Sequence, residues 1–478
     1  MKDKHKISVF GTGFVGLVTA AVFADKGWRV IAVDIDKEKV EKVNNGEPFF
    51  YEPNLESLLK RAVFEQKTLT ATTKQQESVL ETSMTFICVG TPTRKDGSCN
   101  LDFVRAVTQT IGKALAKKKD YHLVVVKSTV VPETTRKVVL PLLEKTSGKK
   151  VGKDFGLCMN PEFLREGQSI HDTIFPDRII VGEIDERSGE TLANLYAQLY
   201  DEKSDAFSSF WSQIYGKKPQ KPPIKRYSLE TAELIKYANN CFLATKISFV
   251  NELANICEQT PGADINDIAD AMGLDFRINP HFLKAGAGFG GSCFPKDVGA
   301  IISYALARNY QPNLLESVLA VNAFQAQHMV ELVEKELGAL KGMTIALLGL
   351  SFKPGTDDMR NAPSLTISEL LRAKQAKVIA WDPKAIKEAR KEEWLGEKIT
   401  YATSLKEALT AADACLLVTD WPEFKTLTPV DFKCMRQKIL IDGRRIYDPA
   451  EFLKAGIHYR GIGLGMKENG NKNSQGEQ

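Results

Sequence analysis

A glycine-rich turn near the start of the chain limits the possible folds more than any other feature. Residues 6–10 (Lys-Ile-Ser-Val-Phe) form a short apolar strand, which leads into Gly11-Thr-Gly-Phe-Val-Gly16 and then into helix-compatible residues 17–26. A second strand, residues 29–33, ends at Asp34. Glycines at this spacing permit a tight turn beside a pyrophosphate, and an acid after the next strand binds ribose hydroxyls. The pattern predicts a dinucleotide site; the alternative is a tight turn with chance glycines.

The acid also indicates which dinucleotide would bind. The carboxylate of Asp34 would repel a 2′-phosphate, which favours NAD over NADP. Lys37 and Lys39 lie close behind it in the chain and could soften that repulsion. We therefore predict NAD as the cofactor, with its pyrophosphate at the N-terminus of the helix after the turn.

Strands and helices alternate along most of the chain, which indicates parallel α/β sheets. After the first two strands, further strand candidates lie at 84–89, 122–127, 155–159 and 178–182, and a second series at 343–348, 377–381, 414–418 and 438–441. Between the two series, residues 228–259 carry apolar side chains at helical spacing. The predicted fold class is α/β, with two Rossmann-like doubly wound domains joined by a long central helix and a helical domain.

Changes in composition place the domain boundaries. Residues 201–226 hold aromatics, serines, lysines and three prolines, which favours irregular structure. The last dozen residues are polar, with Gly, Asn and Gln, which is typical of a disordered tail. We expect an N-terminal NAD-binding domain at 1–205, an irregular loop insertion at 206–226, a central helical and dimerisation domain at 227–337, a C-terminal Rossmann-like domain at 338–465 and a disordered tail at 466–478.

The composition argues against several classes of function. Of 478 residues, 43% are hydrophobic and 26% are charged, and the net charge of +4 comes from interspersed charges, so neither nucleic-acid nor membrane binding is indicated. No apolar run approaches the roughly 20 residues of a membrane span. Eight cysteines without a CxxC pair and six dispersed histidines indicate reduced thiols in a cytoplasmic protein and argue against a metal site.

The segment KAGAGFGGSCFPKD, residues 284–297, places a cysteine where a helix is expected to begin. The helix dipole and the neighbouring Lys296 would favour the thiolate of Cys293. The glycines before it remove side chains where a substrate or another backbone would approach closely: Gly286, Gly288, Gly290 and Gly291. A glycine-rich loop with a buried structural cysteine is the alternative.

Two further pairs of residues could serve acyl chemistry. Glu162 and Glu166 are four residues apart and would share one face if their segment is helical. Lys236 and Asn240 have the same spacing on the long helix and could hold a developing oxyanion, although a solvated helix face is the more frequent meaning. Thr129 ends a strand, where its hydroxyl could order water or the cofactor or could serve only as a cap.

The second α/β series lacks the dinucleotide fingerprint. Its first strand ends in Leu-Gly-Leu-Ser-Phe-Lys, residues 348–353, with a single glycine, so a second NAD site is not expected there. Lys353 and Arg360 flank a loop at the carboxyl end of this strand, where α/β sheets bind ligands. Such cations suit a phosphorylated substrate, and ordinary loop charges remain the alternative.

Together, these segments resemble the UDP-glucose 6-dehydrogenases of the nucleotide-sugar dehydrogenase family, over residues 5–463. The motifs that carry the resemblance are GTGFVG at 11–16, CVGTPT at 88–93, KSTV at 127–130, NPEFLREG at 160–167, KYANN at 236–240, GFGGSCFPKD at 288–297, GLSFKPGTDDMR at 349–360 and DGRR at 442–445. Their joint occurrence in this order is highly specific.

The resemblance implies a four-electron oxidation of UDP-glucose to UDP-glucuronate with two NAD. Cys293 would attack an aldehyde at C6 to form a thiohemiacetal, and water assisted by Glu162 would hydrolyse the thioester that forms next. Lys236 and Asn240 match the family's oxyanion stabilisers. Asp297 with Thr129 matches the residues that organise water and proton transfer.

The resemblance also implies where the substrate binds. Lys353 and Arg444 match positions that hold the sugar nucleotide in the C-terminal domain, and Glu166 maps near the nicotinamide. Arg277 matches an arginine offered across a dimer interface. We therefore expect a homodimer or a higher homo-oligomer, with the long helix at the interface, although the sequence fits a buried intrachain helix equally well.

The motifs and the resemblance together predict three sets of site residues. The catalytic set is Cys293, Glu162, Lys236, Asn240, Asp297 and Thr129. The cofactor set is Gly11, Gly13, Phe14, Val15, Gly16, Asp34, Lys39, Thr91, Thr129, Glu166, Lys296 and Arg360. The substrate set is Glu162, Phe163, Leu164, Lys236, Asn240, Arg277, Phe282, Lys284, Gly290, Lys353 and Arg444.

Three alternatives stay open. The substrate could be GDP-mannose or another nucleotide sugar, because a related 6-dehydrogenase has a cysteine in a similar GGSC context. A two-electron β-hydroxyacid dehydrogenase of similar layout would not need Cys293. A NAD-binding scaffold or redox sensor would bind the dinucleotide and form no NADH with any sugar nucleotide.

Overall fold

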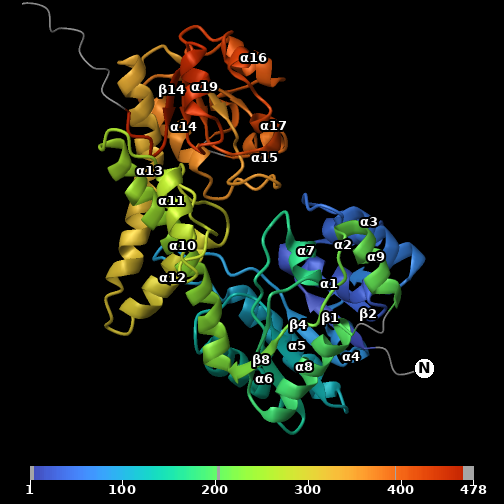
Figure 1. Ribbon diagram of the computed structural model, residues 1–478. Coiled ribbons are helices and arrows are strands. Elements are labelled where there is room, and N and C mark those ends of the chain that lie inside the picture. Colours follow the sequence, from blue (N-terminus) through green and yellow to red (C-terminus); the bar gives the residue numbers. More distant parts are fainter. Residues whose placement is uncertain (1–4, 202–204, 393–394, 467–478) are drawn as a thin grey trace, which may run out of the picture. The chain divides into compact units, whose positions relative to one another are not determined.

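The computed structural model describes residues 5–201, 205–392 and 395–466, which form two compact units. The first unit contains the residues up to Asn239 together with Gly299–Arg308, and the second contains Asn240–Val298 and the residues from Asn309 onward. In Figure 1 the first unit runs mainly from blue to green and the second mainly from yellow to red. Helices α10 (Leu229–Glu258) and α12 (Phe294–Leu306) contribute residues to both units.

The first unit is built on an eight-stranded sheet in the order β3-β2-β1-β4-β5-β6-β7-β8. Its strands are β1 (Lys6–Phe10), β2 (Arg29–Val33), β3 (Leu69–Thr72), β4 (Met84–Ile87), β5 (His122–Val126), β6 (Phe155–Met159), β7 (Ile179–Glu183) and β8 (Ile224–Ser228). All neighbouring strands are parallel except β6 and β7. The sequence predicted every strand but β3 and β8, the two edge strands. Both are short and partly exposed, so neither has the continuous apolar run of a central strand.

Helices connect these strands, as parallel pairing requires. They are α1 (Phe14–Asp25), α2 (Lys37–Asn44), α3 (Leu55–Lys60), α4 (Gln75–Glu81), α5 (Asp102–Lys117), α6 (Leu140–Ser147), α7 (Ser169–Ile174), α8 (Glu186–Leu199) and α9 (Asp205–Tyr215), with π-helical turns η1 (Arg61–Glu65) and η2 (Thr135–Val139). Two of these helices have an aspartate as the N-cap. The Asp36 side chain accepts a hydrogen bond from the amide of Glu38 in α2, and the Asp185 side chain accepts one from the amide of Ser188 in α8.

The second unit repeats the plan with a six-stranded sheet in the order β11-β10-β9-β12-β13-β14. Its strands are β9 (Thr344–Leu348), β10 (Lys377–Trp381), β11 (Thr400–Tyr401), β12 (Ala414–Leu417), β13 (Ile439–Asp442) and β14 (His458–Gly461). Its other helices are α11 (Ile265–Gly273), α13 (Asn313–Leu337), α14 (Pro363–Ala373), α15 (Ile386–Ala389), η3 (Gly396–Lys398), α16 (Leu405–Thr410), α17 (Pro422–Lys425), α18 (Pro429–Phe432) and α19 (Pro449–Lys454). All its strand pairs are parallel.

Each sheet is buried on both faces. Along β1, Ile7 and Val9 pack into one core while Phe10 packs into the core on the opposite face. Along β9, Leu347 and Leu348 are divided in the same way. Helices covering both faces are the arrangement of a doubly wound sheet, so the predicted α/β fold class is confirmed.

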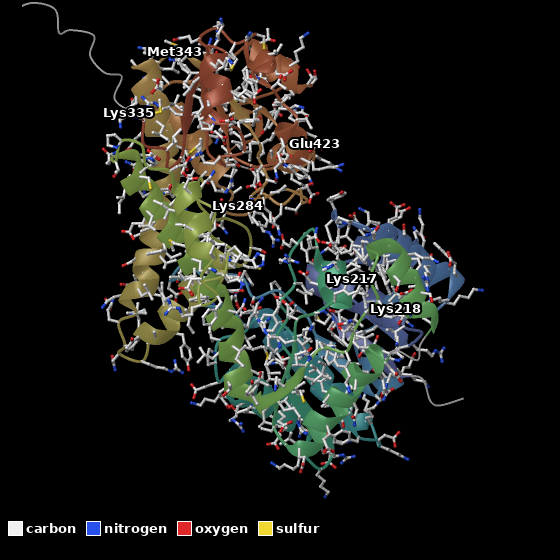
Figure 2. The ribbon with its side chains drawn as sticks, in the orientation of Figure 1. Lys217, Lys218, Lys284, Lys335, Met343 and Glu423 are labelled. Atoms are coloured by element: carbon white, nitrogen blue, oxygen red, sulfur yellow. The ribbon has the colours of Figure 1, made fainter. Side chains whose placement is uncertain are left out.

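The segment predicted as an irregular insertion at 206–226 is largely ordered, so that prediction was wrong. It contains most of helix α9 and part of strand β8, and Trp211 is fully buried in the core of the first unit. The indole Nε1 of Trp211 donates to Asp25 Oδ2 at 2.9 Å. The aromatic side chains that suggested a loop are the ones that dock this helix. Lys217 and Lys218 come after it at the surface (Figure 2).

The helical region does not form a compact unit of its own. Residues 227–337, predicted as a central domain, are divided between the two units, with the division inside α10 and again inside α12. The predicted tail 466–478 lies outside the described residues except for Met466. Among the helices that are described, none combines the length and apolar character needed to cross a membrane.

Helix α10 carries an exposed apolar stripe. Phe242, Phe249 and Ile256 stand at intervals of seven residues, and their exposed fractions are 65%, 47% and 56%. An intrachain core helix would bury these side chains. The face of α10 that carries Phe242, Phe249 and Ile256 therefore does not fit the alternative of a buried intrachain helix.

Candidate active site

The glycine turn of the first unit leaves open space at the start of helix α1. Gly11 has a φ of 91°, and a Cβ on Gly16 would lie 1.8 Å from the carbonyl oxygen of Gly11, so neither position accepts a side chain. A Cβ on Gly13 would meet no atom within 4 Å. Gly13 is the N-cap of α1 and has no side chain to compete for the first backbone N–H groups. The turn therefore fits a pyrophosphate at a helix N-terminus.

Asp34 stands beside this turn, directly after β2. Its Oδ2 accepts hydrogen bonds from the amide and hydroxyl of Thr12 at 2.8 and 2.6 Å, and its Oδ1 accepts from the amide of Asp36 at 3.1 Å. Burial raises the pKa of Asp34, but these hydrogen bonds and the nearby Lys39 outweigh it, and the net pKa lies below the ordinary value. An ionised acceptor held at this place suits ribose hydroxyls.

Other predicted cofactor residues lie around the same edge of the sheet. Phe14 packs against Phe50 with ring centroids 4.1 Å apart, and Val15 is half-buried at the start of α1. After β4 and β5, Thr91 Oγ1 donates to the carbonyl of Thr129 at 2.8 Å, which ties the two loops together. The residues present in this unit fit NAD.

A buried ion pair lies in the first unit after strand β6. Glu162 Oε1 is 2.8 Å from the Nζ of Lys236 on α10, and the side chains are 7% and 4% exposed. Glu162 Oε2 accepts from the amide of Leu164 at 2.6 Å. Burial raises the pKa of Glu162, but Lys236 and the amide outweigh it, so the net pKa falls below the ordinary value. The carboxylate is therefore ionised at neutral pH and can act as a base.

The segment around Glu162 is not helical. Residues 160–165 are irregular, and α7 begins only at Ser169, so the proposed common helical face for Glu162 and Glu166 does not exist. Phe163 instead lies under two cations, with Arg178 at 4.0 Å and Lys236 at 5.5 Å from its ring centroid. The half-buried Glu166 belongs to the turn before α7.

A second cluster lies in the second unit, around the cysteine. Cys293 directly precedes α12, so its thiol is at a helix N-terminus, and its backbone carbonyl accepts from the amide of Asp297 at 2.8 Å. Asp297 is 1% exposed, its Oδ2 accepts from Asn240 Nδ2 at 2.6 Å, and its other oxygen pairs with Lys296. The half-buried thiol and a fixed carboxylate thus share the first turn of one helix.

The glycines before Cys293 allow close packing between backbone segments of the second unit. A Cβ on Gly290 would lie 2.3 Å from the carbonyl oxygen of Asn361, and one on Gly286 would lie 2.7 Å from the Arg444 guanidinium. The amide of Gly291 donates to the carbonyl of Arg360 at 2.8 Å. The cysteine loop is therefore packed against the loops after β9 and β13.

Those two loops carry the cations predicted for the sugar nucleotide. Lys353 comes after β9, with its Nζ 5.4 Å from the centroid of the Phe352 ring. Arg444 comes after β13, and its Nε donates to the carbonyl of Val418 at 2.5 Å. Arg360 is exposed and pairs with Asp358 at 2.7 Å. The carboxyl edge of the second sheet thus presents positive groups beside the cysteine loop.

The remaining predicted substrate residues are closer to the surface. Arg277 pairs with its neighbour Asp275 at 2.5 Å, and its side chain is 75% exposed. Lys284 is exposed (Figure 2). Phe282 lies beside Phe294, the residue after Cys293, with ring centroids 6.4 Å apart. In the described part of the chain, Arg277 is thus not joined to the cysteine cluster by an ion pair or a hydrogen bond.

The site residues therefore form two groups. The cofactor turn, Glu162 and Lys236 belong to the first unit, and Cys293, Asn240 and Asp297 belong to the second. Helix α10 carries one member of each group, Lys236 and Asn240, one turn apart. Sequence reasoning missed Lys127, which is 8% exposed after β5. Its signal was a lysine that directly follows the apolar run of residues 123–126.

Two Rossmann-like units, one with a dinucleotide turn and one with cations at the same edge, are typical of the class of dinucleotide-binding α/β proteins. Comparison with known proteins identifies the family. Residues 5–200 match the NAD binding domain of the UDP-glucose/GDP-mannose dehydrogenase family, residues 230–324 match its central domain, and residues 346–449 match its UDP binding domain. The chain belongs to this family and is a NAD-dependent oxidoreductase.

Individual relatives match most or nearly all of the chain. The chain is 42% identical to the UDP-glucose 6-dehydrogenase AglM of Haloferax volcanii, over 94% of this chain and 98% of the relative. It is 40% identical to the GDP-mannose 6-dehydrogenase of Azotobacter vinelandii, over 79% and 81% of the two chains. The solved structure of a UDP-glucose dehydrogenase from Pyrobaculum islandicum matches with a TM-score of 0.86 and 36% identity, over 97% and 98% of the two chains.

Proposed function

We propose that the protein oxidises UDP-glucose at C6 to UDP-glucuronate, in a four-electron reaction that passes through covalent intermediates on Cys293. The observation that carries this proposal is the first turn of α12, where Cys293 precedes a buried Asp297 that Asn240 holds in place. An enzyme that oxidised an alcohol by two electrons would need a base and a cofactor but no nucleophile at this position.

The thiol reacts after the first oxidation. When bound, NAD⁺ supplies the hydride acceptor for both oxidations. In the first oxidation the C6 hydroxyl passes its proton to water ordered by Asp297 and Thr129 and C6 loses a hydride, which leaves an aldehyde. The Cys293 thiolate then forms a carbon–sulfur bond to C6, and the carbonyl electron pair moves to oxygen to give the oxyanion of a thiohemiacetal. A second hydride leaves C6, and the product is a thioester.

Hydrolysis completes the reaction. Glu162 accepts a proton from water as the water oxygen bonds to C6, and the carbon–sulfur bond breaks with its electron pair returning to Cys293. In this proposal, Lys236 and Asn240 stabilise the oxyanion that forms at this step and at thiol addition. Asp297 and Thr129 order water and carry protons.

The choice of UDP-glucose has two supports. Residues 346–449 match a UDP binding domain, and the UDP-glucose 6-dehydrogenase relative aligns with more of the chain than the GDP-mannose 6-dehydrogenase does. In this proposal Lys353 and Arg444 bind the diphosphate, because two cations at the edge of the sheet match its charge. GDP-mannose or another nucleotide sugar is the second candidate, since the family includes both activities.

We also propose that the protein is a homodimer or a higher homo-oligomer. The exposed stripe of Phe242, Phe249 and Ile256 on α10 supports a contact between copies, and the 75% exposed Arg277 is available to a neighbouring copy. Light scattering on the purified protein tests this, because a monomeric mass would contradict it. A cytoplasmic location also remains a proposal.

One assay tests the reaction and the substrate together. Absorbance of NADH is followed with a panel of UDP- and GDP-sugars, and the product is identified by mass. We expect two NADH per UDP-glucose and a uronic acid product. One NADH with a released aldehyde or ketone would contradict the mechanism, and faster turnover of GDP-mannose would contradict the substrate. No NADH with any sugar would favour a NAD-binding scaffold.

A further inference from the structure

Lys127 is a buried cation that the proposed mechanism does not use. It stands directly after strand β5, and the residue is 8% exposed. Its Nζ donates to Asn160 Oδ1 at 3.0 Å and to the hydroxyl of Tyr196 at 3.5 Å. Removing an ammonium group from water costs several kcal/mol unless hydrogen bonds and opposite charge compensate for it. The position therefore has a specific reason to hold a lysine.

Asn160 connects Lys127 to the segment that carries Glu162. The Oδ1 of Asn160 accepts a second hydrogen bond from the Tyr196 hydroxyl at 2.5 Å, and its Nδ2 donates to the carbonyl of Ile180 at 2.8 Å. Its backbone amide donates to the carbonyl of Val126 at 2.8 Å. Residues 160–165 form no helix or strand, so no regular backbone hydrogen bonding holds this segment in place. The side-chain hydrogen bonds of Asn160 hold it instead.

Lys127 also acts on the carboxylate electrostatically. Burial raises the pKa of Glu162, and Lys236 and Lys127 both lower it. In return, burial lowers the pKa of Lys127, and the Glu162 carboxylate opposes that change. In the described part of this unit, the ionisable groups around Lys127 and Glu162 include Lys236 from α10, Cys88 after β4 and Tyr196 from α8, and Arg178 lies over the Phe163 ring.

The thiol and the phenol in this group do not carry charge at neutral pH. Burial raises the pKa of Cys88 to about 12 and raises that of Tyr196 well above its ordinary value. Among these groups of the described chain, Glu162 is thus the one that carries a negative charge. Lys127 is in turn a second cation near Glu162 besides the directly paired Lys236.

We propose that Lys127 is a positioning residue for Glu162, which fixes the 160–164 segment through Asn160 and supplies a second buried positive charge near the carboxylate. This inference rests on the proposed role of Glu162 as the base of thioester hydrolysis. The tether keeps the carboxylate in place, and the charge keeps it ionised before water is activated.

Three variants separate the tether from the charge. Lys127→Gln keeps an N–H donor for Asn160 and removes the charge, whereas Lys127→Met removes both. Tyr196→Phe removes the other donor to Asn160 and keeps the charge. The matched control is Lys118→Gln, because Lys118 is a half-buried lysine just before β5, at the opposite end of the same strand. Its Nζ donates to the carbonyls of Val79 and Leu80 at 2.9 and 3.0 Å.

Two readouts are needed. The first is the ¹³C NMR titration of Glu162 in protein labelled at glutamate, assigned with Glu162→Gln. The second is the pH profile of NADH formation from UDP-glucose. In Lys127→Gln we expect the Glu162 titration and the acidic limb of the profile to move up by about 1 pH unit. In Lys127→Met we also expect turnover to fall by about 10²-fold through misplacement of the carboxylate.

The controls make the result decisive. Tyr196→Phe and Lys118→Gln should lower thermal stability and leave the Glu162 titration in place. The proposal is overturned if Lys127→Gln leaves both pH curves unmoved, or if Tyr196→Phe moves them equally. Because the NMR titration needs no substrate, it decides the role of Lys127 even if the wild-type protein forms no NADH, an outcome that would count against the proposed function alone.

Discussion

The two Rossmann-like units start in the same way. The first strand of each sheet runs into a glycine with a left-handed backbone, Gly11 with a φ of 91° and Gly349 with a φ of 92°. The amide of Gly11 donates to the carbonyl of Val33 at 2.8 Å, and that of Gly349 donates to the carbonyl of Trp381 at 2.9 Å. In both units a Cβ on this glycine would meet a neighbouring segment at less than 3 Å, so both turns need glycine for the same reason.

The units differ in the segment after that glycine. In the first unit α1 starts at Phe14, so its N-terminus lies directly at the turn. In the second, residues 349–362 separate β9 from α14, and this longer loop carries Lys353 and Arg360. One turn leaves backbone N–H groups at a helix N-terminus, and the other carries cationic side chains.

The acid after the second strand shows the same divergence. Asp34 is half-buried and keeps capacity to accept further hydrogen bonds. Asp382 occupies the corresponding place after β10 but is 3% exposed. It accepts from Trp421 Nε1 and from four backbone amides, those of Leu350, Ser351, Lys384 and Ala385. The corresponding acid keeps acceptor capacity for a ligand in one unit and holds loops together in the other, so an acid there does not by itself indicate a dinucleotide site.

The largest effect is expected from the thiol of the second unit. Cys293→Ala should reduce formation of the uronic acid by on the order of 10⁴-fold or more, because the proposed acyl intermediate forms on the Cys293 sulfur. NAD binding should remain unchanged, since the turn lies in the first unit. Cys434→Ala, at an exposed cysteine of the same unit, is the control for both assays. Full acid formation by Cys293→Ala or Cys293→Ser would contradict the covalent mechanism.

Asp382→Ala tests the structural role of the buried acid. We expect the free energy of unfolding to fall by about 3–5 kcal/mol, because the substitution leaves several buried donors without an acceptor. Urea denaturation measures this change. A loss of less than about 1 kcal/mol would show that water replaces the carboxylate and would remove the contrast between the units.

Asp34→Ala tests the recognition role of the corresponding acid. We expect the dissociation constant of NAD to rise by about 10–100-fold, because a charge-assisted hydrogen bond to the ribose is lost. Discrimination against NADP should fall as well, since the carboxylate no longer repels a 2′-phosphate. Calorimetric titration with both dinucleotides measures this, and unchanged affinity for NAD would contradict the assigned site.

The pH dependence of the free energy of unfolding should reveal the titration of Glu233, a buried carboxyl group of the first unit. Burial raises the pKa of Glu233 to about 7, while Thr135 donates its amide to Glu233 Oε1 at 2.7 Å. Between the ordinary pKa of a glutamate and this value, the folded state holds a proton that the unfolded state releases, so stability falls as pH rises through this window.

The glutamine variant tests this assignment. Glu233→Gln should remove about 2 kcal/mol of the decline in unfolding free energy between pH 5 and 8, measured by denaturation at each pH. Glu162→Gln is the control, because the pKa of Glu162 is lowered and its contribution is lost only in more acidic solution. A decline that persists in Glu233→Gln would assign the effect to another group.

The smallest effect is expected at helix α9. Trp211→Phe removes the indole donor to Asp25 and keeps an aromatic ring in the core. Asp25 retains its ion pair with Arg61 at 2.9 Å, so we expect a loss of about 1 kcal/mol in unfolding free energy and no change in turnover. A change in turnover without a loss of stability would mean that α9 has a role in the reaction.

Much of the fold was predictable because its strands are short and apolar on both faces. The predicted strand at 377–381 coincides with β10, and the helix predicted at 228–259 is observed as Leu229–Glu258. The edge strands β3, β8, β11 and β14 were missed, since an edge strand needs less continuous burial. Helix α9 was missed because its apolar residues stand in a stretch rich in serine, lysine and proline.

The candidate site was predictable only in part. The residue types at Gly11, Asp34 and Cys293 carry their own chemical meaning, so the motifs indicated them directly. The Glu162–Lys236 pair joins residues 74 positions apart, and no local spacing reveals such a contact. A common face for Glu162 and Glu166 was expected only if their segment is helical, and the structure shows that it is not; a four-residue spacing has this meaning only inside a helix.

By itself, the sequence determined the α/β fold class, the dinucleotide turn and the place of the thiol at the start of a helix. Each depends on short-range pattern: buried strand periodicity, glycine sterics and helix termini. The tertiary structure alone decided which charges meet. It paired Glu162 with Lys236, brought Lys127 to Asn160, and turned the acid after β10 into an internal link, because burial and hydrogen bonding depend on segments that the chain brings together only when it folds.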